Sequence, residues 1–119
     1  VKDIKNIKFR EFSDAHGETG DALIFFLENA KKAKEFNKML AERKMGTKLL
    51  PEALNWHFAG TWDHILSRYK EYRGKNLEAI WGRSASILRR AIALPIFIKM
   101  TNEQIDYTIK AIHEIASKV

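Results

Sequence analysis

The sequence predicts a small α/β (α+β) sandwich, in which a mixed or antiparallel sheet packs against helices. Three observations indicate this class. A strand, a turn and a second strand occupy residues 6–27, apolar residues recur at helical spacing in residues 30–40 and 105–119, and an apolar run between them contains a proline. With 119 residues, no internal repeat and no long linker, the chain is expected to form one domain over residues 1–119.

Two strands and a tight turn are expected near the N-terminus. Residues 6–12 alternate so that Ile7 and Phe9 share one face, and residues 16–21 have the glycines and small polar residues of a turn. Residues 21–27 are almost wholly apolar, as in a buried strand. Together they predict an antiparallel hairpin.

A helix is expected next, because Asn29 can cap it and its apolar residues recur every three or four positions. Gly46 is well placed to end this helix after two basic residues. Residues 47–50 then predict a short strand that a proline stops.

The middle of the chain predicts shorter helices. Thr61 can cap a helix that runs through Tyr72, since four apolar or aromatic residues share one of its faces, and Gly74 closes the segment. Residues 74–83 are expected to be connecting structure or a short helix, and another short helix is expected over residues 84–90.

Pro95 predicts that residues 91–98 form an edge strand or an irregular extended segment, because proline lacks the amide proton that a central strand needs. The last helix has the strongest signals, since Thr101 followed by Gln104 makes a capping box. Its apolar stripe consists of Ile105, Ile109, Ile112, Ala116 and Val119.

Composition limits the classes of function. Without cysteine, the chain cannot hold a thiolate zinc site, use a cysteine nucleophile or form a disulfide. The lack of cysteine gives no sign of an oxidising compartment, so a cytoplasmic protein is expected. The apolar runs 22–27 and 91–98 are shorter than the roughly 20 residues that span a bilayer, so no membrane partner is expected. The formal charge of +6 favours an acidic partner, although its largest concentration, residues 31–38, has the pattern of a solvated helix face.

Common catalytic motifs are absent from the sequence. It contains no G-x-S-x-G, H-E-x-x-H, Walker or G-x-G-x-x-G pattern, so no catalytic residue is assigned. His57 and His64 need not face each other, and no metal site is expected. The loop Trp56-His57-Phe58 places three ring side chains between a strand and a helix. It either anchors itself in the core or presents a ring-lined wall to a ligand.

Two stretches of the chain resemble a known family. Residues 20–65 and 88–116 are similar to the C-terminal small domain of the DegT/DnrJ/EryC1/StrS family, the pyridoxal-phosphate-dependent sugar aminotransferases. In the second stretch, Arg90, IALP (92–95) and MTNEQI (100–105) keep the family's order of a basic residue, an SLP-type segment and MT-x-E-x-I. The fold that this resemblance implies is the small domain of fold-type-I aminotransferases.

The first stretch contains KMGTKLLPEALNWHF (44–58), which is similar to the turn and loop that the family uses near the bound sugar. The resemblance implies that Trp56 and His57 face the substrate, with His57 bonding a hydroxyl or carboxylate. It also implies that Arg90 holds the IALP segment or an acidic group, with a surface ion pair as an equal alternative. Ala93 stands where the family often has serine, a departure that removes a hydroxyl.

The resemblance further implies the C-terminal domain of a transaminase that moves an amino group from a glutamate-like amino acid to a keto sugar. Its setting would be the biosynthesis of lipopolysaccharide or another cell-surface polysaccharide, in a homodimer. NWHFAGTWDH (55–64) is most similar to the branch that aminates an acidic eight-carbon sugar. Most pyridoxal phosphate contacts belong to a larger N-terminal domain that no segment here matches, so the cofactor-binding residues stay unassigned and the 119 residues alone are expected to be inactive.

A stand-alone basic binding or regulatory module is the alternative function, with nucleic acid or an acidic protein as the partner. The positive charge and the aromatic residues allow it. However, no RNP-type strand motif is present, and the aromatic residues fall mostly on positions expected to be buried. Nucleic acid is therefore not the favoured partner. A regulatory subunit that dimerises through its apolar helices is a third reading, which sequence does not separate from a truncated enzyme.

Overall fold

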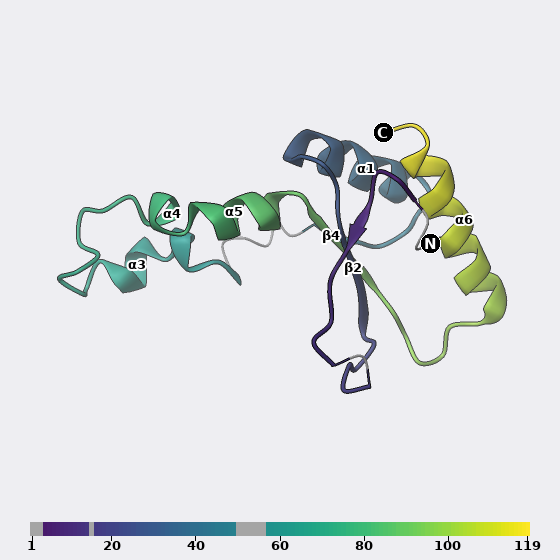
Figure 1. Cartoon of the computed structure of the whole chain (residues 1–119), viewed down its shortest axis with the longest axis horizontal. Coiled ribbons are helices and arrows are strands. Elements are labelled where there is room, and N and C mark those ends of the chain that lie inside the picture. Colours follow the sequence, from purple (N-terminus) through teal and green to yellow (C-terminus); the bar gives the residue numbers. More distant parts are fainter. Residues whose placement is uncertain (1–3, 15, 50–56) are drawn as a thin grey trace.

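The computed structural model describes residues 4–14, 16–49 and 57–119. Within them a four-stranded antiparallel sheet has the strand order β1-β2-β4-β3, and α1 and α6 pack on one of its faces (Figure 1). The predicted α+β sandwich is confirmed. The strands are β1 (Lys8–Phe9), β2 (Ala22–Phe26), β3 (Lys48–Leu49) and β4 (Ala91–Pro95). The helices are α1 (Ala30–Glu42), η1 (Ala59–Thr61), α3 (Asp63–Leu66), α4 (Leu77–Ile80), α5 (Gly82–Arg89) and α6 (Asn102–Ala116).

The main core lies between the sheet and the helices α1 and α6. Alternate residues of the two long strands point into it, because successive side chains of a strand face opposite sides of the sheet. Phe25 packs edge-on against Phe36 of α1, with ring centroids 5.4 Å apart. The fully buried residues of this core with the largest side chains are Phe25, Leu27, Phe36, Leu40, Ile92, Ile112 and Ile115.

The predicted hairpin is confirmed. Phe9 pairs with Phe25 in an antiparallel register, and β1 is only two residues long. The pairing extends one step further, because the amide of Arg10 donates to the carbonyl of Ile24 at 3.2 Å. Beyond this point the side chain of Arg10 turns to Glu18, at 2.6 Å, across the turn.

The helix α1 begins as predicted, with the side chain of Asn29 accepting the amide of Lys32 at 3.0 Å. Its end differs from the prediction. Lys44, and not Gly46, takes the left-handed conformation that closes the helix, with φ of 58°. The amide of Lys44 donates to the carbonyl of Ala41 at 2.8 Å, so a lysine occupies a position that most often holds glycine.

The placement of the segment around Pro95 was predicted wrongly. β4 is a central strand, paired with β2 on one side and β3 on the other. The amide of Ile96 donates to the carbonyl of Asp21 at 2.8 Å, so the next pair inward, Pro95 with Ala22, is one that exchanges no hydrogen bond. The nitrogen of Pro95, which carries no proton, therefore faces the β3 side of the strand. At that point β3 has no paired residue, because its pairing with β4 covers only Lys48–Leu49. A central strand can tolerate proline at that point.

The helix α6 is confirmed with its complete capping box. Thr101 accepts the amide of Gln104 at 3.3 Å, and the side chain of Gln104 accepts the amide of Thr101 at 3.0 Å. The predicted stripe is buried only in its C-terminal half, since Ile112 is fully buried whereas Ile105 is 41% exposed.

The helices between β3 and β4 form an arm that projects from the sheet (Figure 1). The long helix predicted from Thr61 to Tyr72 is wrong. Only a 3-10 turn, the four residues of α3 and a series of turns are formed. The hydroxyl of Thr61 donates to the carbonyl of Phe58 at 2.8 Å, so it does not cap α3. Further along, Asn76 caps α4, and α5 starts at Gly82 where residues 84–90 were predicted.

The arm has a small core of its own, in which Trp81 and Leu88 pack against buried Phe58 and Ala85. This separate cluster explains the elongated shape of the chain, whose extents are 53 × 32 × 24 Å. Gly60 is required there, because a Cβ atom on it would lie 2.3 Å from the ring of Phe58.

Candidate functional site

Of the three residues predicted to bind substrate, Trp56 lies outside the described residues. His57 is described and exposed, and Phe58 separates it from the 3-10 turn η1. Phe58 is 5% exposed and anchors the loop in the core of the arm. The sequence left two roles open for this loop, anchoring in the core and contact with a ligand. Phe58 has the anchoring role, whereas His57 is exposed and could contact a ligand.

Arg90 lies where the arm joins the sheet, at the C-terminal end of α5. Its guanidinium Nη1 donates to the carbonyl of Leu27 at 3.4 Å and lies close to the ring of Phe26, with the guanidinium carbon 6.0 Å from the ring centroid. The carbonyl of Arg90 accepts the amide of Leu27 at 2.9 Å. Among the described residues Arg90 forms no ion pair, so the surface ion pair is not the role that the structure supports.

Arg90 borders two hollows, and His57 lines neither of them. The first has a volume of about 330 Å³ and lies between the start of α1 and the arm, where Arg89 pairs with Glu78. The second, of about 260 Å³, lies beside β1 and the end of β2, with Lys5 and Lys8 in its wall. The predicted site residues are thus not gathered in one of these cavities.

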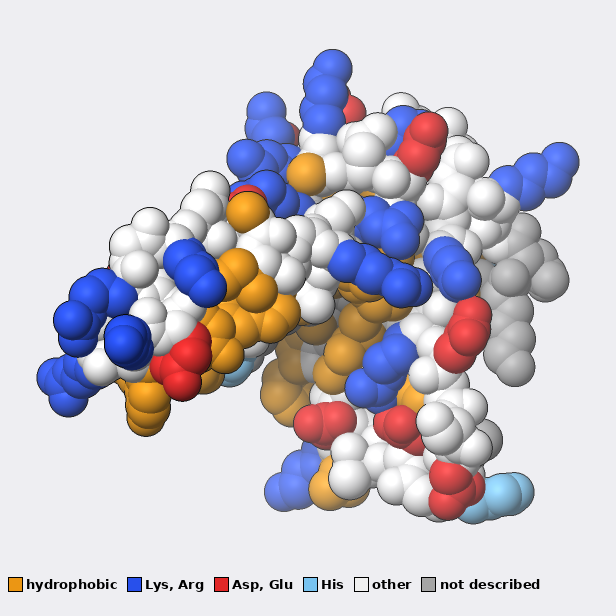
Figure 2. Space-filling model, turned by 60° about the vertical axis from the view of Figure 1, so that its left-hand side comes forward, with side chains coloured by type: hydrophobic (Ala, Val, Ile, Leu, Met, Phe, Trp, Pro, Cys, Tyr) orange, Lys and Arg blue, Asp and Glu red, His pale blue; other side chains and the backbone are white. Residues whose placement is uncertain are grey.

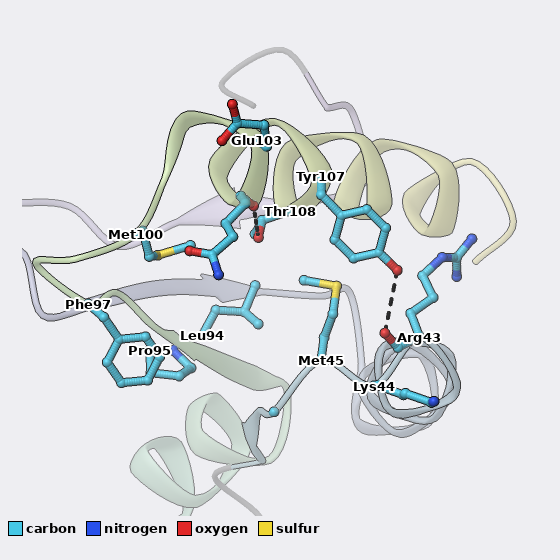
Figure 3. Close-up of a pocket in the computed structure, with 12 residues that line it drawn as sticks. Arg43, Lys44, Met45, Leu94, Pro95, Phe97, Met100, Glu103, Tyr107 and Thr108 are labelled. Carbon is cyan, nitrogen blue, oxygen red and sulfur yellow. Dashed lines mark hydrogen bonds between the residues drawn. The ribbon is translucent and has the colours of Figure 1, made fainter.

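A further hollow was not predicted from the sequence. It has a volume of about 470 Å³ and lies between the end of α1, the end of β4 and the first half of α6 (Figure 3). Met45, Leu94 and Met100 give it an apolar floor, and Phe97 stands at one side. Sequence offered a faint signal in the apolar run 96–98, which was expected in an edge strand or an irregular extended segment and which the structure places after β4 and exposed.

Polar groups stand at the rim of this hollow. The hydroxyl of Tyr107 donates to the carbonyl of Arg43 at 3.4 Å, which joins α6 to the end of α1. Glu103 points away from the hollow in Figure 3. A hydrogen bond from the Thr101 side chain, followed by one from its own backbone amide, lowers the pKa of the exposed Glu103 carboxyl. The hollow suits an apolar group better than a charged one.

No charged or polar side chain is buried among the residues that the structure describes. Pyridoxal phosphate needs a lysine, a carboxylate and a phosphate cradle held together away from water. The described residues do not supply such a set, and they do not fit the cofactor on their own. In the same residues no three His, Asp or Glu side chains are grouped to bind a metal ion, and no helix has the length and hydropathy to cross a membrane.

The fold matches that of a solved aminotransferase. The chain superposes on the "Putative sugar aminotransferase Spr1654 from Streptococcus pneumoniae, PMP-form" with a TM-score of 0.63 and 15% sequence identity. The match covers 95% of this chain and 26% of that chain, so these residues span about a quarter of the neighbour. No family model and no curated protein sequence matches the chain. The likeness shows an aminotransferase-like α+β fold.

Proposed function

We propose that these residues are one domain of a larger pyridoxal-phosphate-dependent sugar aminotransferase of the DegT/DnrJ/EryC1/StrS family. The observation that carries the proposal is the superposition of nearly the whole chain on about a quarter of a sugar aminotransferase. A fold alone does not define a reaction. The order of Arg90, the IALP segment and the MT-x-E-x-I segment supports the same family independently of the superposition.

In this proposal the domain closes over a cofactor pocket that the rest of the protein builds. Pyridoxal phosphate supplies the chemistry of amino transfer when it is bound there. This chain contributes no lysine to the cofactor, in agreement with the lack of buried charged groups among its described residues. Its part is to exclude water and to orient the sugar.

His57 is the residue of this chain that we propose for contact with the sugar. It is exposed beside Phe58, whose ring is held in the core of the arm. An anchored neighbour limits the movement of the loop and holds the imidazole where it can bond a hydroxyl or carboxylate. We propose Trp56, which lies outside the described residues, as a second residue that contacts the sugar.

Arg90 would act at the base of the arm. One of its donors already holds the carbonyl of Leu27, and the guanidinium retains further donors beside the two hollows that it borders. We propose that these remaining donors hold an acidic group of the substrate, while the bond to Leu27 keeps the arm aligned with the sheet.

The finer parts of the proposal follow from the resemblance. The acceptor is an acidic eight-carbon keto sugar, the donor is a glutamate-like amino acid, and the enzyme is a cytoplasmic homodimer in cell-surface polysaccharide biosynthesis.

The first experiment is to determine the mass of the native polypeptide with an antibody raised against these residues. A species several times heavier than 13.8 kDa is expected. That species should then transfer an amino group from glutamate to a keto sugar when it is purified with its cofactor. A native species of 13.8 kDa would leave no room for the cofactor-binding part and would favour a binding or regulatory module.

A further inference from the structure

The end of the arm is a compact turn that sequence analysis assigned to a helix. The amides of Tyr72 and Arg73 both donate to the carbonyl of Tyr69 at 3.1 Å. The side chain of Arg73 returns to the carbonyl of Ser67 at 3.3 Å, and Gly74, with φ of 70°, reverses the chain. Residues 67–75 are called the basic knuckle below. Its backbone is hydrogen-bonded, so the Cα atoms that carry its side chains are held in a defined turn.

The basic knuckle holds four cations and one acid. The cations are Arg68, Lys70, Arg73 and Lys75, and all four are exposed. None of them forms an ion pair with another described residue. Residues 31–38 of α1 likewise hold four lysines and one acid, Glu35, but there Lys32 pairs with Glu28 at 2.9 Å. The knuckle therefore matches residues 31–38 in its excess of positive charge, and it differs from them in having no ion pair among the described residues.

Apolar side chains accompany these cations. Tyr69 is 56% exposed and Ile65, on α3, is 43% exposed. Tyr72 instead packs against Trp81, with ring centroids 5.8 Å apart, and so joins the knuckle to the rest of the arm. Figure 1 places the turn after α3 at the far end of the arm, and Figure 2 shows Lys and Arg side chains gathered on that end with hydrophobic side chains beside them.

The shape of this surface decides between classes of anionic partner. No residue of 63–75 lines the hollows described above, which lie elsewhere on the molecule. Because the knuckle lies at the protruding end of the arm, it can contact a flat surface such as a membrane without the sheet and its helices blocking the approach. An exposed aliphatic side chain gains little from a phosphate backbone but partitions into the boundary between headgroups and acyl chains.

We propose that the basic knuckle docks on the surface of an anionic lipid membrane. Its cations contact lipid phosphates while Tyr69 and Ile65 enter the headgroup region. This inference does not depend on the aminotransferase function, and it differs from the expectation that the chain has no membrane partner. Each Lys or Arg near an anionic bilayer strengthens binding about five-fold, so loss of two cations should weaken it about 25-fold.

The test uses the 119-residue chain and vesicles of phosphatidylcholine, with or without a minor fraction of phosphatidylglycerol. The double variant Lys70→Glu/Lys75→Glu removes two cations from the knuckle. The matched control, Lys31→Glu/Lys34→Glu, makes the same change of charge on exposed positions of α1. Tyr69→Ser tests the apolar contact, and circular dichroism checks that every variant folds.

Co-sedimentation should show that the wild type binds the anionic vesicles, that the knuckle variant binds at least about 25-fold more weakly and that the α1 control changes less than about three-fold. Tyr69→Ser should weaken binding several-fold. The proposal is overturned if the two double variants behave alike or if the wild type does not bind the anionic vesicles. It is also overturned if single-stranded oligothymidylate binds more tightly than those vesicles, which would indicate a nucleic-acid surface.

Discussion

Replacing Gly60 with alanine should destabilise the arm. The new Cβ atom would lie 2.3 Å from Cε1 and 2.5 Å from Cζ of the Phe58 ring, and 3.1 Å from the Cα atom of Glu78. The ring cannot move freely, because Phe58 is buried in the small core that it shares with Trp81. Overpacking of this kind costs about 1–3 kcal/mol of unfolding free energy.

Gly46→Ala is the matched control, since a Cβ atom there meets nothing within 4 Å and the residue has no positive φ. It should leave stability unchanged or raise it by about 0.4–1 kcal/mol, because alanine restricts the unfolded chain. The two variants add the same methyl group, so only the surroundings of each glycine distinguish them.

Urea unfolding followed by tryptophan fluorescence is the assay, because all three tryptophans fall within residues 56–81. With an m-value of about 1–3 kcal/mol/M, the expected cost moves the midpoint down by about 1 M for Gly60→Ala. Far-UV circular dichroism, which reports mainly on α1 and α6, should shift less if the arm opens separately. Equal midpoints for Gly60→Ala and the wild type would refute the close packing of η1 against Phe58.

Four further predictions concern α6, the sugar and the cofactor. Thr101→Ala should lower the unfolding free energy by about 0.5–2 kcal/mol, because the capping box of α6 is lost. The measurement is the urea midpoint of unfolding, which should fall. The folded state lowers the pKa of Glu103, so its carboxylate stabilises the folded chain at pH values above the unfolded pKa. The unfolding free energy of the wild type should therefore exceed that of Glu103→Gln at neutral pH, and the difference should vanish as the pH falls through the folded pKa. A difference that stays constant across acid pH would contradict this prediction. In the larger enzyme, His57→Ala should reduce turnover of the sugar more than cofactor binding, with exposed His64→Ala as control, and equal kinetics for both variants would remove His57 from the site. The purified 119-residue chain should not acquire the absorbance of lysine-bound pyridoxal phosphate, and its appearance would overturn the proposed function.

Local signals determined most of the secondary structure. Asn29 and Thr101 cap α1 and α6 as predicted, because a capping side chain bonds an amide two or three residues away. The hairpin likewise follows from alternation and a short polar turn, which act within a few residues. Such interactions are contained in the sequence itself.

Helix lengths in the arm were not contained in local pattern. Apolar spacing after Thr61 predicted a long helix. In the structure the ring of Phe58 fills the small core of the arm, and the helix α3 ends after four residues. Gly74 and the bond from Arg73 to Ser67 then close the knuckle. Packing between segments overrode the helical period there.

The candidate site divides in the same way. Sequence alone, through the resemblance, selected Trp56, His57 and Arg90 and an acidic partner. The tertiary structure showed that Arg90 holds the carbonyl of Leu27 and that four exposed cations without an ion pair among the described residues lie at the end of the arm. Likewise, a proline signals a strand edge, but only the pairing of β2 and β3 around β4 decides whether its missing amide proton is needed. Which groups meet across the fold depends on contacts between residues far apart in the chain, and these contacts form only when the sheet and helices pack together.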